Sequence, residues 1–67
     1  MDRDQGHLSR THNSKAEVIR LCKANPGILI ALDAGDGWTS LWLSKRRGEA
    51  PRSHGMINPQ GQYLASM

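Results

Sequence analysis

A short turn rich in glycine and aspartate constrains this chain more than any other feature. Residues 33–37 read Asp-Ala-Gly-Asp-Gly, and they separate an apolar run at 28–32 from a segment rich in β-forming residues at 38–44. Two such segments joined by Gly-Asp or Asp-Gly predict a β-hairpin, because these residues adopt the positive φ angles of tight hairpin turns. The hairpin is therefore the first element that we expect.

The length of this turn decides which side chains share a face, since a shift of one residue exchanges the two faces of a strand. A two-residue turn, at 35–36 or 36–37, puts Trp38 and Trp42 on one face with Leu29 and Ala31. An odd-length loop would instead put both tryptophans with the isoleucines. We expect the two-residue turn, because it is the commoner hairpin connection. The opposite, aliphatic face then consists of Ile28, Ile30, Leu32, Thr39, Leu41 and Leu43.

An amphipathic helix is predicted immediately before the hairpin. Residues 14–17 fit the capping-box pattern, in which the Ser14 hydroxyl accepts a hydrogen bond from the backbone of Glu17 and the Glu17 carboxylate bonds back to Ser14. Asn-Pro-Gly at 25–27 ends the helix, because proline disfavours helical geometry in the residue before it. So short a helix is marginal alone in water, and we expect it to pack on the aliphatic face of the hairpin. Its own apolar face consists of Val18, Ile19, Leu21 and Cys22.

The rest of the chain has weaker patterns. Residues 1–13 are polar and predict a flexible arm, and residues 49–55 predict a loop. Asn-Pro-Gln-Gly at 58–61 suits a type I turn, which would close a second small hairpin within 48–67. The predicted fold class is α+β: one short amphipathic helix on a small antiparallel β-sheet, in the order α-β-β with two further short C-terminal strands. Its core lies within 14–47.

Length and composition exclude several classes of protein. A chain of 67 residues without phenylalanine forms one small core at most. Cys22 is the only cysteine, so an internal disulfide is excluded, and no apolar run is long enough to span a bilayer. No signature groups a nucleophile with a base, and so short a chain hardly encloses a substrate. We expect a non-enzymatic cytoplasmic protein without a cofactor.

Metal binding has little support in the sequence. The candidate zinc ligands lack the short paired spacings that zinc sites use. The two aspartates of the hairpin turn lack the ligand pattern of a calcium loop, and a local hydrogen bond to their own backbone explains them. The candidate zinc ligands are His7, His12, His54 and Cys22.

Two groups of residues are candidates for binding a partner. Trp38 and Trp42 would stack on bases or anchor a protein contact, unless Ile57, Tyr63 and Leu64 fold across them. The net charge is +3, and a basic group follows the predicted second strand. These residues would contact phosphates or an acidic partner, or are ordinary solvated charge at a strand end. The basic group consists of Lys45, Arg46, Arg47 and Arg52.

Two functions are compatible with these residues. We favour a small basic nucleic-acid-binding accessory or regulatory protein, because the basic and aromatic residues lie on adjoining segments. The alternative is a small regulator or inhibitor, of the kind common in phages and mobile elements, that binds a larger host protein complex. It would use the same tryptophans and arginines as the energetic centre of the interface.

Overall fold

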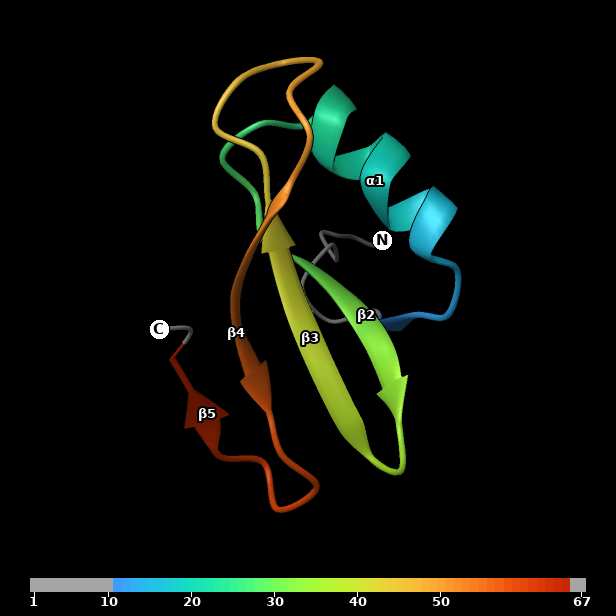
Figure 1. Ribbon diagram of the computed structural model, residues 1–67, viewed down its shortest axis with the longest axis vertical. Helices are drawn as coiled ribbons and strands as arrows, with labels where there is room; N and C mark the ends of the chain where they lie inside the picture. The colour runs from blue at the N-terminus through green and yellow to red at the C-terminus, as the bar shows by residue number, and fades with distance from the viewer. Residues whose placement is uncertain (1–10, 66–67) are drawn as a thin grey trace, which may run out of the picture.

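The computed structural model describes residues 11–65, which form one helix and a five-stranded sheet (Figure 1). The predicted α+β fold, with a helix on a small sheet and further C-terminal strands, is confirmed. Within residues 11–65, no helix is long and apolar enough to cross a membrane. The elements are β1 (Thr11–His12), α1 (Lys15–Ala24), β2 (Ile30–Gly35), β3 (Trp38–Leu43), β4 (Arg52–Ile57) and β5 (Tyr63–Leu64).

The strands lie side by side in chain order, and all neighbours are antiparallel except β1 and β2. β1 comes from the segment that the sequence predicted to be a flexible arm. Thr11 pairs with Ala31 and His12 with Leu32, so the prediction was wrong for these two residues. The part of the predicted arm at 1–10 lies outside the described residues.

Helix α1 begins and ends where the sequence predicted. The Ser14 hydroxyl accepts a hydrogen bond from the Glu17 backbone N–H at 3.3 Å, which satisfies one of the free amides of the first turn. The Glu17 carboxylate pairs with Arg20 one turn later, so the expected return bond to Ser14 is replaced by a surface ion pair. At the other end Asn25 caps the helix, and its N–H donates to the Leu21 carbonyl at 2.9 Å.

The β2–β3 hairpin has the predicted turn but a different strand register. Asp36 and Gly37 have φ angles of 56° and 84°, which match a two-residue type I′ turn. However, the register shifts by one residue between Asp33 and Gly35, so Ala34 is an extra residue in β2. Such a β-bulge moves every side chain before it to the other face relative to β3. A local hydrogen bond, from the Gly35 N–H to Asp33 Oδ1 at 2.8 Å, stabilises it.

The bulge reverses the predicted relationship between the tryptophans and the core. Ile30 lies opposite Trp42, and Leu32 lies opposite Ser40, so these side chains share the face that α1 covers. The prediction that the tryptophan face points away from the helix was therefore wrong. The buried core cluster consists of Val18, Cys22 and Ile30, and the partly buried side chains packed against it are Leu21, Ile28, Leu32 and Trp42.

The C-terminal segment extends the sheet. β4 begins at Arg52, within the predicted loop, and pairs with β3 along its length. The predicted turn forms, since the Gly61 N–H donates to the Asn58 carbonyl at 2.8 Å, and it leads into β5. Tyr63 and Leu64 are 58% and 45% exposed. Trp42 packs on the core cluster beneath α1.

Candidate nucleic-acid interface

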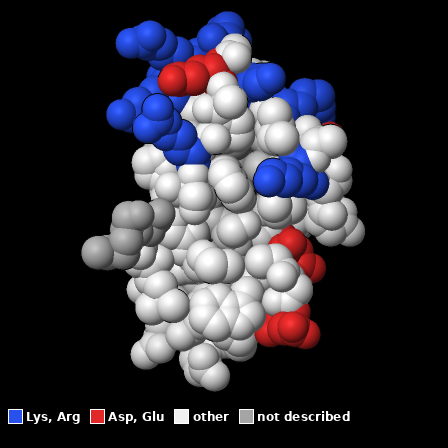
Figure 2. All heavy atoms as spheres, viewed as in Figure 1, with Lys and Arg blue, Asp and Glu red and all other residues white. Residues whose placement is uncertain are grey.

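Basic residues from two elements and a loop gather at one end of the molecule. Lys45, Arg46 and Arg47 lie in the loop between β3 and β4, and Arg52 begins β4, where it pairs with Leu43. Figure 2 shows Lys and Arg side chains over this end, above the sheet. We define the basic end as the exposed side chains Lys23, Lys45, Arg46, Arg47 and Arg52.

Lys23 joins this group because the β3–β4 loop packs against the end of α1. The Gly48 N–H donates to the Lys23 carbonyl at 2.9 Å, and Arg47 Nη1 donates to the Ala24 carbonyl at 3.1 Å. Carbonyls at a helix C-terminus lack partners within the helix and carry partial negative charge, so an arginine there is favourable. Arg47 therefore has a structural role beside any binding role, since one guanidinium leaves further N–H groups free.

Ser44 holds the β3–β4 loop at the end of β3. Its side chain is 1% exposed, and its hydroxyl donates to the Glu49 carbonyl at 2.6 Å. Its own carbonyl accepts from the Gly27 N–H at 2.9 Å, which ties the end of β3 to the segment after α1. A bond from the Glu49 N–H to the Arg46 carbonyl, at 3.1 Å, closes the tip. These bonds order the loop in the free protein.

Charge is distributed unevenly along the molecule. Asp33 and Asp36 belong to the β2–β3 hairpin. At the lower right of Figure 2 acidic side chains, in red, lie away from the Lys and Arg side chains, in blue, at the top. Glu49 is the acidic residue of the loop itself, and its Oε1 atom is buried without a hydrogen-bond partner within the described part of the chain. With five cations against this one carboxylate, the basic end keeps an excess of positive charge.

Trp42 is not available as a flat surface for stacking. It packs on the core cluster, and its Nε1–H donates to the Ser40 hydroxyl at 2.9 Å. The Lys15 ammonium lies 5.2 Å from the centre of its ring, within the range of a cation–π interaction. The structure therefore places this predicted site residue in the core, with one ring face against a lysine.

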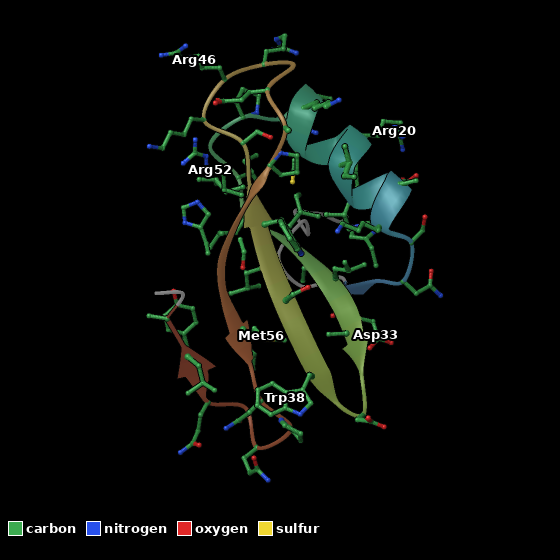
Figure 3. The ribbon with its side chains drawn as sticks, viewed as in Figure 1. Arg20, Asp33, Trp38, Arg46, Arg52 and Met56 are labelled. Carbon is green, nitrogen blue, oxygen red and sulfur yellow. The ribbon has the colours of Figure 1, made fainter. Side chains whose placement is uncertain are left out.

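Trp38 lies far from the basic end. It begins β3, whereas the basic loop follows the end of β3, and that strand spans about 17 Å at a rise of about 3.4 Å per residue. Figure 3 shows Trp38 near the lower end of the sheet and Arg46 and Arg52 near the upper end. Of the predicted site, the structure brings the four basic residues together, places Trp38 at the opposite end of β3 and packs Trp42 on the core.

Sequence reasoning missed the residues that build the loop. Lys23 joins the basic end only through the packing of the loop on α1, which no local pattern indicates. A glycine directly after three basic residues is a sequence signal for a sharp turn, because glycine adopts positive φ angles easily. In the structure Gly48 has a φ of 82°. The sequence does not indicate the structural role of Ser44, because serine is common at the end of a strand.

The described residues do not assemble a metal centre: no group of three or more His, Cys, Asp or Glu among residues 11–65 could hold a metal ion. Of the candidate ligands, His7 lies outside the described residues. Cys22 is fully buried in the core, and this burial raises the pKa of its thiol, so the neutral form is favoured.

Comparison with known proteins does not assign the chain to a group. No protein-family model matches it, and no curated protein or solved structure is significantly similar.

Proposed function

We propose that this protein is a non-enzymatic nucleic-acid-binding protein whose basic end contacts the phosphate backbone. The observation that carries the proposal is the gathering of Lys and Arg side chains from α1, the β3–β4 loop and β4 on one end. Side chains of this kind neutralise phosphates and release condensed counterions, which supplies most of the affinity for nucleic acid.

The ordered loop favours binding. Ser44, Gly48 and Arg47 hold it by hydrogen bonds to the backbone of neighbouring segments. A loop that is already ordered loses less conformational entropy when it binds, so more of the electrostatic attraction appears as affinity. We place this activity in the cytoplasm, where a lone buried thiol such as Cys22 stays reduced.

The test is a titration of a fluorescently labelled 20-base-pair DNA duplex with the protein at several salt concentrations, read by fluorescence anisotropy. With about four phosphate contacts, the logarithm of the binding constant falls with the logarithm of salt with a slope of about −3.6. Arg46→Gln and Arg52→Gln each remove one contact, so each should weaken binding and make the slope shallower by about 0.9.

Arg20→Gln is the control, because Arg20 lies on the side of α1 away from Arg46 and Arg52 (Figure 3) and its charge is already paired with Glu17. It should change affinity much less than Arg46→Gln. Equal losses from all three variants would mean that net charge alone drives binding, and no binding at 50 mM salt would refute the proposal.

An acidic protein surface is the other partner that fits the basic end. Competition with poly-glutamate, at equal concentration of negative charge, separates the two. Displacement of the duplex by poly-glutamate as effectively as by unlabelled duplex would favour the alternative, a regulator that binds a larger protein complex.

A further inference from the structure

We infer that the ring of Tyr63 stacks on an unpaired base of the nucleic acid whose phosphates the basic end contacts. This inference rests on the proposed function and adds a residue and a class of ligand to it. Proteins that bind single strands combine basic residues, which contact phosphates, with exposed aromatic rings, on which bases stack. Strands β4 and β5 bring one ring of this kind close to Arg52.

Tyr63 and Arg52 lie on the same face of the sheet. Arg52 pairs with Leu43 on β3. Tyr63 pairs with Ile57, which in turn pairs with Thr39 on β3. Residues directly opposite each other share a face, and so do alternate residues along one strand. Because Leu43 and Thr39 are four positions apart on β3, their partners Arg52 and Tyr63 share one face.

A bulge in β4 is responsible for this arrangement. Two steps along β3, from Ser40 to Trp42, correspond to three steps along β4, from Met56 to Ser53. Such an extra residue moves the side chains before it to the other face of the strand. Trp42 and helix α1 lie on the opposite face of the sheet from Tyr63, so the helix does not cover the tyrosine ring.

The ring of Tyr63 is held in place and yet open to solvent. Its hydroxyl donates to the His54 carbonyl at 2.6 Å. Gly55 has no side chain, and a Cβ added there would lie 2.8 Å from Cε1, so the ring lies directly on the backbone of β4. Tyr63 is nevertheless 58% exposed. A ring that is already fixed loses little conformational entropy when a base stacks on it.

The place of the ring suits one strand of nucleic acid that also contacts Arg52. His54, whose carbonyl binds the tyrosine hydroxyl, lies two residues after Arg52, or about 7 Å along β4. Phosphates of a stacked strand follow each other at about 3.4 Å along its axis. A base on Tyr63 therefore leaves a phosphate about two nucleotides away beside Arg52. The tryptophans are less suitable, since Trp42 packs on the core and Trp38 lies at the opposite end of β3.

The experiment compares two labelled probes by fluorescence anisotropy at 50 mM salt. One is a 20-nucleotide oligodeoxythymidine, and the other is a strand of the same length whose sugars carry no bases. We expect the wild type to bind the first probe about tenfold more tightly, because stacking one base has an effect of this size. Tyr63→Leu should abolish this ratio, since it fills the same place without an aromatic face, and Tyr63→Phe should retain it.

Two further variants serve as controls, and every variant is first checked for a native circular dichroism spectrum. Leu64→Ala is the matched control, because Leu64 is also exposed on β5 but faces the other side of the sheet, where it pairs with Met56. It should leave the ratio unchanged. Arg46→Gln should weaken binding of both probes by the same factor, since it removes a phosphate contact only.

The outcomes separate this inference from the function on which it rests. Equal affinity of the wild type for the two probes, with both weakened by Arg46→Gln, overturns the role of Tyr63 and leaves the proposed function standing. A ratio that persists in Tyr63→Leu, or that is lost as fully in Tyr63→Phe or Leu64→Ala, also overturns that role. Absence of binding to both probes and to the duplex overturns the inference and the proposed function together.

Discussion

Ile30 on β2 and Trp42 on β3 lie directly opposite each other and pack together against the core under helix α1. This pair makes Trp42 part of the small core. It also explains why the helix stays on the sheet, since a ten-residue helix needs an apolar surface to be stable. The large apolar ring supplies much of that surface in a chain without phenylalanine.

The first prediction concerns the stability that Trp42 provides. Replacing it by alanine removes the ring from the core and its hydrogen bond to Ser40, so Trp42→Ala should lower the free energy of unfolding by about 3 kcal/mol. Trp38→Ala, outside the core cluster, is the control and should cost about 1 kcal/mol. Urea unfolding followed by circular dichroism measures both. A similar loss in the two variants would contradict the core role of Trp42.

The sequence predicted the features that depend on neighbouring residues. The helix cap at Ser14, the type I′ turn at Asp36 and Gly37, and the turn that begins at Asn58 each depend on residues within four positions. The register of the hairpin was predicted wrongly because Ala34 is bulged, and one extra residue exchanges the faces. The Asp-x-Gly pattern at Asp33 was available as a signal, since its carboxylate binds the Gly35 N–H.

Features that depend on distant segments were harder to predict. β4 begins inside the stretch 49–55, which the sequence predicts to be a loop because it contains Pro51, Ser53 and Gly55. Its ladder with β3 also shifts register at this point, opposite the stretch between Ser40 and Trp42. The four basic residues of the predicted group lie together in the structure, but their separation from Trp38 follows from the three-dimensional path of β3.

A second prediction tests the bulge in β2. Gly35 has a φ of 87°, and a Cβ added there would meet nothing within 4 Å. A substitution therefore lowers stability through the strained backbone angle and not through a steric clash. Gly35→Ala should lower the free energy of unfolding by about 1 kcal/mol or more, and Gly35→Asn by less, because asparagine tolerates this region better. Thermal unfolding of the two variants provides the comparison. Equal stability of both variants and the wild type would show that this conformation is not required.

A third prediction concerns the pairing of β4 and β5. A Cβ at Gly55 would lie 2.6 Å from the Leu64 carbonyl oxygen and 2.8 Å from the Tyr63 ring, and the φ of Gly55 is 118°. Gly55→Ala should therefore separate β5 from β4 and expose its amides to hydrogen exchange. Tyr63→Phe removes only the hydrogen bond to the His54 carbonyl and should cost about 1 kcal/mol while keeping the pairing. Unchanged amide protection of Leu64 in Gly55→Ala would contradict the close approach.

A fourth prediction connects the loop to binding. Ser44→Ala removes the buried hydroxyl that donates to Glu49, which should cost about 1 to 2 kcal/mol of stability and loosen the basic loop. Duplex binding at a temperature where the variant is folded should weaken several-fold, although no charge has changed. Ser53→Ala on β4, where the serine is exposed, is the matched control. Unchanged binding by Ser44→Ala would mean that loop order does not contribute to affinity.

The last prediction uses the buried thiol of Cys22. Its pKa is raised above the ordinary value of 9.0 because burial disfavours the thiolate. Below pH 9 the thiol is protonated in both the folded and the unfolded state, so its contribution to stability is fully present. As the pH rises above 9, the unfolded chain loses this proton first, and stability falls until the raised folded pKa is reached. Urea unfolding between pH 7 and pH 10.5 should thus show a steeper alkaline loss for the wild type than for Cys22→Ala. The two chains differ only at this position, so parallel curves would contradict the burial of the Cys22 thiol.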